Sequence, residues 1–108
     1  MSEARLTRLK QIADLVLEQR SARLAEAGSA RASVQARLAA LDQWPGEGEC
    51  AEPALQISWY RFEKWATPRR LELQREAAVC EANWLSALAE ARRAFARVQV
   101  LNGLSQRR

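Results

Sequence analysis

The sequence predicts an all-α fold, a long antiparallel two-helix coiled-coil hairpin whose second arm is kinked near Pro68. Its 108 residues include 21 Ala, the best helix former, but only 2 Phe and 1 Tyr. Apolar and small residues recur at steps of three and four, which is the period of a coiled coil. Helix-breaking residues gather in one segment, WPGEGECAEP at 44–53. We therefore expect one domain, 1–108, with two arms and one turn.

The first arm is predicted over residues 3–43, which contain no proline and a single glycine. Its apolar stripe comprises Leu6, Leu9, Ala13, Val16, Leu24, Ala27, Val34, Leu38 and Leu41. Arg20 and Arg31 fall on the same stripe. The spacing between Val16 and Leu24 resembles a coiled-coil stutter. The arm is therefore expected to be a long helix with two cations on its packing face.

The turn is predicted over residues 44–53. Trp44 precedes a proline, which disfavours helical geometry at that position. The two glycines of the segment permit positive φ angles. Pro53 suits the first turn of a new helix, because its missing N–H would have no partner there. A connection of this length lets the second arm fold back on the first.

The second arm is predicted over residues 54–104. Its opening segment, ALQISWYRFEKWA, fits a helix better than a strand. Pro68 either kinks this helix or opens a new one with Thr67 as its N-cap. The stripe beyond it comprises Leu73, Ala77, Cys80, Trp84, Leu88, Ala91, Phe95, Val98 and Leu101. Gly103 is expected to fray or end the helix, with a frayed terminus at 105–108.

An antiparallel hairpin would bring the two termini together at a basic end. The basic residues there are Arg5, Arg8, Lys10, Arg92, Arg93, Arg97, Arg107 and Arg108. The turn would instead be acidic, through Asp42, Glu47, Glu49 and Glu52. Such charge runs are often only solvated faces, and cations also suit a helix C-terminus. The functional alternative is that the basic end docks on an acidic partner surface or on phosphates.

Several kinds of chemistry have no residues to support them. The sequence has no histidine, and its two cysteines fit no zinc motif. It has no glycine-rich phosphate loop and no nucleophile elbow. We therefore expect no enzyme, no catalytic residue, no cofactor-binding residue and no metal site. Cys50 and Cys80 should not form a disulfide, because the helix between them would span about 45 Å.

The chain also lacks the apolar run of a transmembrane helix, and charges interrupt its N-terminal segment where a signal peptide would be apolar. A cytoplasmic protein without membrane insertion is therefore expected. Among the tryptophans, Trp84 lies on the predicted stripe and should pack there. Trp44, Trp59 and Trp65 would either form an aromatic plug that closes the hairpin or remain exposed to meet a partner.

Both arms resemble the FliJ/YscO family, the small stalk proteins of flagellar and type III secretion export. The first arm shares leucine, alanine and arginine positions with the family's opening helix: Leu6, Leu9, Leu24, Ala25, Ala27, Arg31, Leu38 and Leu41. The closing segment, WLSALAEARRAFARVQVLNGLSQRR, is similar to its last helix through Trp84, Arg92, Arg93, Val98, Leu101 and Arg107. The PGEGE breaker and Pro68 are departures from the family pattern.

The resemblance implies a bacterial coiled-coil stalk or escort whose joined termini insert into the hexameric export ATPase. The implied ATPase-binding residues are Arg5, Arg8, Arg92, Arg93 and Arg97. The tip half would meet the export gate protein or chaperones through Trp59, Tyr60, Phe62 and Trp65. The protein would then lie in the cytoplasm, peripheral to the inner-membrane export machinery.

Two alternatives compete with the export role. In one, the basic coiled coil binds nucleic acid, although it has no nucleic-acid-binding motif and acids are interleaved through residue 90. In the other, the chain is an oligomerisation module that forms a homodimer, in which two hairpins build a four-helix bundle. Dimerisation is compatible with the export role.

Overall fold

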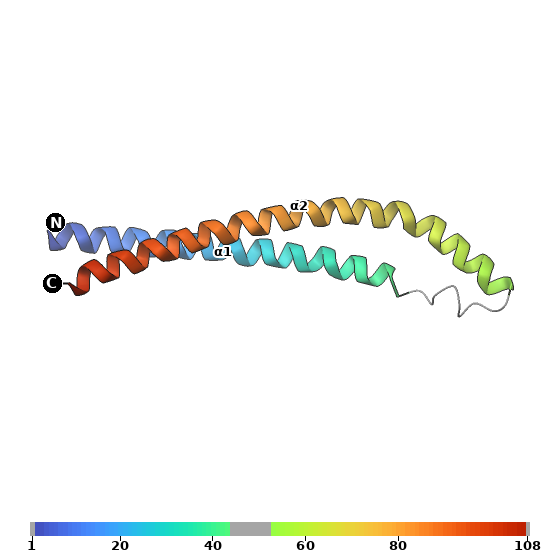
Figure 1. Cartoon of the computed structure of the whole chain (residues 1–108), viewed down its shortest axis with the longest axis horizontal. Helices are drawn as coiled ribbons and strands as arrows, with labels where there is room; N and C mark the ends of the chain where they lie inside the picture. The colour runs from blue at the N-terminus through green and yellow to red at the C-terminus, as the bar shows by residue number, and fades with distance from the viewer. Residues whose placement is uncertain (1, 44–52, 108) are drawn as a thin grey trace. The chain divides into compact units, whose positions relative to one another are not determined.

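A computed structural model of the chain describes residues 2–43 and 53–107. It has two helices, α1 at Glu3–Leu41 and α2 at Pro53–Gln106, and no strand in the described residues (Figure 1). The predicted all-α helical hairpin is confirmed. Neither helix has a stretch that is long and apolar enough to cross a membrane, over the residues described.

The ends of the helices differ slightly from the predicted arms. α1 ends at Leu41, and the next two N–H groups donate to carbonyls three residues back, at Ala39 and Ala40. Pro53 is the first residue of α2, as its fixed φ angle favours. The expected stop at Gly103 is wrong, because α2 continues to Gln106.

Ser2 caps the N-terminus of α1, although it lies outside the predicted first arm. Its Oγ accepts a hydrogen bond from the Arg5 N–H at 3.2 Å, and its carbonyl accepts one from the Leu6 N–H at 3.0 Å. The first turn of a helix has free N–H groups, and a serine cap satisfies one of them. The cap therefore defines where α1 begins.

α2 runs through Pro68 without a break, so the alternative of a new helix capped by Thr67 is wrong. Figure 1 shows the axis of α2 curving along its green and yellow part, toward the end that begins at Pro53. Pro68 cannot donate to the carbonyl of Lys64. The carbonyls on either side accept side-chain hydrogen bonds instead, Glu63 from the Thr67 hydroxyl at 2.7 Å and Trp65 from the Arg69 guanidinium at 2.8 Å.

The chain forms two compact units, and each contains part of both helices. The terminal unit comprises Met1–Ser29 and Ala82–Arg108, and the turn-proximal unit comprises Ala30–Glu81. In the turn-proximal unit, Arg31 pairs with Glu81 and Arg37 with Glu76, so the partner number falls as α1 advances. That pattern shows the antiparallel direction of its two segments. The single-domain assignment stays a prediction.

The packing face of α1 follows an uninterrupted seven-residue repeat. Its buried and half-buried positions at alternating steps of three and four are Leu6, Lys10, Ala13, Leu17, Arg20, Leu24, Ala27, Arg31, Val34, Leu38 and Leu41. Both arginines predicted on this stripe are half-buried there. Leu17 keeps the repeat regular, so no stutter is needed. Leu9, which was predicted on the stripe, lies beside it and is exposed.

The packing face of α2 has the same repeat and is rich in alanine. It comprises Trp59, Glu63, Ala66, Arg70, Leu73, Ala77, Cys80, Trp84, Ala87, Ala91, Ala94, Val98, Leu101 and Ser105. Phe95 was predicted on this face, but it is 54% exposed, whereas Ala94 is 3% exposed. Both fit the local spacing. The small side chain occupies the seam because alanine lets two helices approach closely, and phenylalanine would hold them apart.

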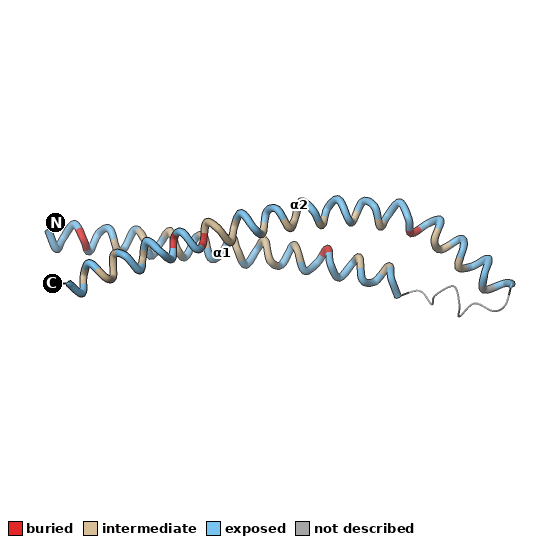
Figure 2. Tube along the Cα trace, viewed as in Figure 1, coloured by how far each residue is buried: buried red, intermediate tan, exposed pale blue. Residues whose placement is uncertain are grey.

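Few side chains are buried in a fold of two helices. Those of the described residues are Leu6, Val34, Ala66, Ala91 and Ala94, the red positions in Figure 2. No polar or charged residue is among them. Because each helix packs on only one other helix, much apolar side-chain surface remains in contact with water.

Candidate docking surface

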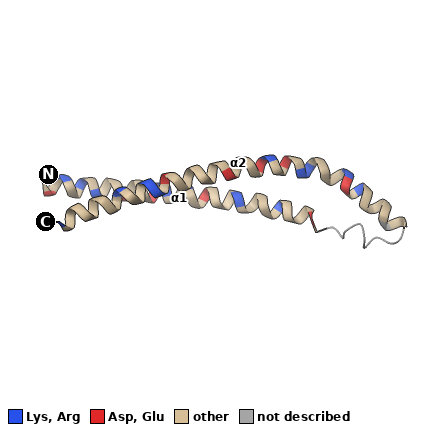
Figure 3. Cartoon of the chain, viewed as in Figure 1, with Lys and Arg blue, Asp and Glu red and all other residues tan. Residues whose placement is uncertain are grey.

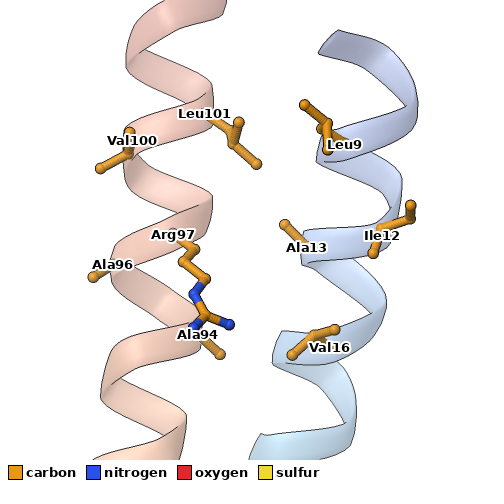
Figure 4. Close-up of a pocket in the computed structure, with 9 residues that line it drawn as sticks. All are labelled: Leu9, Ile12, Ala13, Val16, Ala94, Ala96, Arg97, Val100 and Leu101. Atoms are coloured by element: carbon orange, nitrogen blue, oxygen red, sulfur yellow. The ribbon is translucent and has the colours of Figure 1, made fainter. Parts of the chain in front are cut away.

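An apolar groove lies between α1 and α2 in the terminal unit. It has a volume of about 450 Å³. Figure 4 shows the residues that line it, Leu9, Ile12, Ala13 and Val16 from α1, and Ala94, Ala96, Arg97, Val100 and Leu101 from α2. Arg97 is the one charged side chain among these nine, and the figure shows it extending along the space between the two helices.

The groove exists because each helix carries a second apolar stripe beside its packing face. On α1, Leu9, Ile12 and Val16 follow one another at steps of three and four, so they share one side of the helix. Leu9 is 41% exposed, Ile12 51% and Val100 63%. A single helical partner cannot cover both stripes. The second stripe of α1 can be found in the sequence by its spacing. It was missed because Leu9 and Val16 were both predicted to lie on the packing stripe.

Three of the five predicted docking arginines border this apolar surface. Arg97 lines the groove itself. Arg5 and Arg8 line an adjoining hollow together with Leu9 and Ile12, which also line the groove. We call the groove and this hollow together the docking groove. Guanidinium groups beside exposed apolar side chains make a surface that can bind apolar and acidic groups at once.

The other two predicted residues, Arg92 and Arg93, are exposed on α2 and do not line the docking groove. Figure 3 shows the basic residues of α2 set back from its C-terminal turns, which carry no charge up to Gln106. The predicted set is therefore divided into two groups. Within the described chain, none of the five arginines forms an ion pair with an acidic side chain.

Three acidic residues of the terminal unit lie away from the docking groove. Glu90 of α2 lies 3.9 Å from both Arg20 and Arg23 of α1. Glu3 and Asp14 line a separate hollow of about 370 Å³, together with Leu6, Thr7, Lys10, Gln11 and Ser105. On a helix of 3.6 residues per turn, Gln11 and Asp14 lie across the packing face from Ile12. One side of the unit is therefore apolar and basic, and the other is polar and mixed in charge.

The aromatic residues predicted to face a gate or chaperone all lie on α2. Trp59 is half-buried and Tyr60 is exposed, and both line a hollow of about 530 Å³ with Glu63, Lys64, Thr67 and Pro68. Phe62 lies outside that hollow, with its ring centroid 5.9 Å from that of Trp65. The Arg69 guanidinium lies 4.1 Å from the centroid of the exposed Trp65 ring, a cation–π contact.

Two roles are predicted for Trp44, Trp59 and Trp65: closing the hairpin as an aromatic plug, or remaining exposed to meet a partner. Trp65 contacts residues of its own helix and remains partly exposed. Trp44 lies outside the described residues, as do Glu47, Glu49, Cys50 and Glu52, so the acidic turn and the aromatic plug stay predictions. Asp42 is described, and its carboxylate lies 3.4 Å from the Arg70 guanidinium. Cys80 is a half-buried free thiol on the packing face of α2.

Over residues 2–43 and 53–107, no three side chains of the metal-ligating types gather in one place. The chain was also compared with protein-family models, with curated proteins and with solved structures, and none of them matches it.

Proposed function

We propose that the chain is a non-enzymatic coiled-coil stalk or escort component of a bacterial type III protein export apparatus, flagellar or virulence-associated. Its basic end binds the export ATPase hexamer, and its tip half binds the export gate protein or chaperones. The protein then works in the cytoplasm, at the periphery of the inner-membrane export machinery. The resemblance of both arms to the FliJ/YscO family supports this role, together with one observation on the arginines.

That observation is the set of arginines without acidic partners in the terminal unit. In the turn-proximal unit, Arg31, Arg37 and Arg70 each contact a carboxylate. The five predicted docking arginines contact none among the described residues. Exposed arginines are well solvated by water, so the lack of an acidic partner does not destabilise the fold. Together they produce a positive potential that attracts an acidic protein surface.

Reversing the charge of Arg92, Arg93 and Arg97 to Glu tests the proposed role. The wild-type chain should raise the activity, or promote hexamer formation, of the export ATPase from the same cells. The triple variant should abolish that effect while its helical circular dichroism is retained. Normal stimulation by this variant would refute the assignment of the basic end to the ATPase.

A matched control is available in the turn-proximal unit. Arg61, Lys64 and Arg75 are exposed, and no acidic side chain of the described residues pairs with them. Reversing these three to Glu changes the net charge by the same amount. The control should stimulate the ATPase like the wild type. If it fails equally, the effect follows net charge and the basic end has no special part.

The same unpaired arginines also support nucleic-acid binding as a second candidate function. Contacts with phosphates would release counterions, so binding should weaken steeply as salt rises. A gel shift with duplex DNA and single-stranded RNA at physiological salt separates the two functions. A complex that the Arg92, Arg93 and Arg97 reversal abolishes would favour nucleic acid, and the lack of any complex would exclude it.

A further inference from the structure

We infer that the docking groove binds one amphipathic helix of a partner protein, a helix that carries carboxylates beside its apolar stripe. This inference does not depend on the export role. It rests on the shape of the groove, on the exposure of the side chains that line it and on the distribution of charge around it.

The shape of the groove suits a helix. Its walls are two antiparallel helical segments, and Leu9, Ala13 and Leu101 point toward the space between them (Figure 4). Ile12, Ala96 and Val100, which also line the groove, lie on the outer sides of the two helices in this view. On α1 the groove extends from Leu9 to Val16, or about 10 Å at 1.5 Å per residue. That length matches about two turns of a guest helix. Side-chain ridges of a third helix pack well into the groove between two others.

The lining of the groove supplies the driving force. Leu9, Ile12 and Val100 are 41% to 63% exposed, and a guest helix would remove them from water. A guest of two turns presents apolar residues at positions i, i+3, i+4 and i+7, which is the usual pattern of a helix bound in a groove. Arg97 does not oppose this binding, because its apolar stem can line the groove while its guanidinium stays at the edge.

The charge around the groove selects an acidic guest. Arg5, Arg8 and Arg97 border it, and none of them has a carboxylate partner among the described residues. The acids Glu3 and Asp14 line the other hollow and do not line the groove. Carboxylates that flank the apolar stripe of a guest would therefore meet arginines on both walls.

The same charges disfavour a second copy of this chain as the occupant. A symmetric contact brings the same surface of both copies together. Here it would place the arginines of one docking groove against those of the other, and like charges across an interface lower its stability. An acidic helix from a different protein has no such cost.

Three synthetic helical peptides test the inference. All share one apolar stripe of Leu and Ile, and the positions beside it are Glu in the first peptide, Gln in the second and Lys in the third. Binding to the full chain is measured by fluorescence anisotropy of the labelled peptide. The Glu peptide should bind at least about tenfold more tightly than the Lys peptide, with the Gln peptide between them. Equal binding of the Glu and Lys peptides would overturn the inference.

Substitutions in the chain locate the peptide. Ile12→Ser and Val100→Ser remove exposed apolar groups of the groove, so the fold should be kept and Glu-peptide affinity should fall about tenfold or more. The control is Leu15→Ser, at an exposed leucine that does not line the groove. A loss as large in the control would overturn the assignment of the site.

Charge reversal gives a second and independent readout. Arg5, Arg8 and Arg97 changed together to Glu should make the chain prefer the Lys peptide. The Arg61, Lys64 and Arg75 reversal should leave the preference for Glu unchanged. An unchanged preference in the groove variant would overturn the role of these arginines.

Sedimentation equilibrium of the chain alone tests the competing occupant. A monomer at tens of micromolar is expected. A dimer that Val100→Ser dissociates would show that a second copy fills the groove, and would overturn the inference. Stimulation of an export ATPase is a separate measurement, so the proposed function can survive this failure.

Discussion

The terminal and turn-proximal units are each built from two antiparallel helical segments, but their arginines have different surroundings. In the turn-proximal unit, Arg31 and Arg37 contact carboxylates of the facing helix, and Arg70 contacts Asp42 just beyond the end of α1. In the terminal unit, Arg5, Arg8 and Arg97 border an apolar groove and have no carboxylate partner among the described residues. Arginines with and without carboxylate partners occur in both units, since Arg20 and Arg23 lie near Glu90 in the terminal unit. What sets Arg5, Arg8 and Arg97 apart is that they lie beside an exposed apolar groove.

This difference separates residues that specify the fold from residues available for binding. Ion pairs between facing helices disfavour a shifted register, because a shift would bring like charges together. Unpaired arginines add nothing to that specificity and repel one another slightly. Their position beside exposed Leu9, Ile12 and Val100 is easier to explain by a partner than by stability. The predictions below test this separation, from the largest expected effect to the smallest.

A charge in the packing face should have the largest effect in either unit. Ala66 in the turn-proximal unit and Ala94 in the terminal unit are both buried. Ala66→Asp and Ala94→Asp should each lower the free energy of unfolding by about 3 kcal/mol or more, since a charged and larger side chain would have to be buried where only a methyl group fits now. Urea unfolding followed by circular dichroism measures this loss.

Hydrogen exchange would show which unit opens in each of these two variants. Ala78→Asp, at an exposed position of α2, is the control and should change stability little. If Ala66→Asp and the control behave alike, the packing face of α2 is misassigned.

Removing apolar side-chain volume should lower stability in the packing face but not in the docking groove. Val34 is 1% exposed and is the largest fully buried side chain of the described residues. Val34→Ala should cost about 2 kcal/mol of unfolding free energy, through lost burial and the cavity left behind. Val100→Ala should change stability little, because that side chain is already in water. A similar cost for both, in matched urea titrations, would show that the groove is covered.

Alanine at the two helical glycines should stabilise the chain. A Cβ at Gly28 would lie 3.7 Å from the Trp84 Nε1, an ordinary contact, and one at Gly103 would meet nothing within 4 Å. Neither glycine has a positive φ angle. Gly28→Ala and Gly103→Ala should each add about 0.5 to 1 kcal/mol, because glycine costs backbone entropy in a helix. A decrease in thermal stability for Gly28→Ala would show that Trp84 packs more tightly there.

The smallest effect is expected for an exposed ion pair. The Arg37 guanidinium lies 2.9 Å from the Glu76 carboxylate, and about half of each side chain is exposed. A double-mutant cycle with Arg37→Gln and Glu76→Gln should give a coupling of about 0.2 to 1 kcal/mol that decreases with added salt. Arg97→Gln should show no such salt-dependent loss. A comparable salt-dependent loss for Arg97 would mean that it has an intramolecular partner.

The local sequence was sufficient to predict both helical arms, but it left open whether the second arm continues through Pro68. Alanine content and the steps of three and four predict helices wherever they occur, and the breakers of 44–53 locate the turn between them. Arg20 and Arg31 could be placed on the packing face for the same reason. These features depend only on residues that are near in sequence. The helical period is enough to show which of those residues share one face of a helix.

The tertiary structure decided which residues of two neighbouring stripes meet the other helix. Leu9 and Phe95 fit the period as well as Leu6 and Ala94 do, and the sequence offers no local reason to choose between them. The choice depends on how closely α1 and α2 approach, which the small side chains of the facing helix determine. The docking groove follows from that choice, because the apolar stripe left outside the seam can be recognised only after both helices are in place.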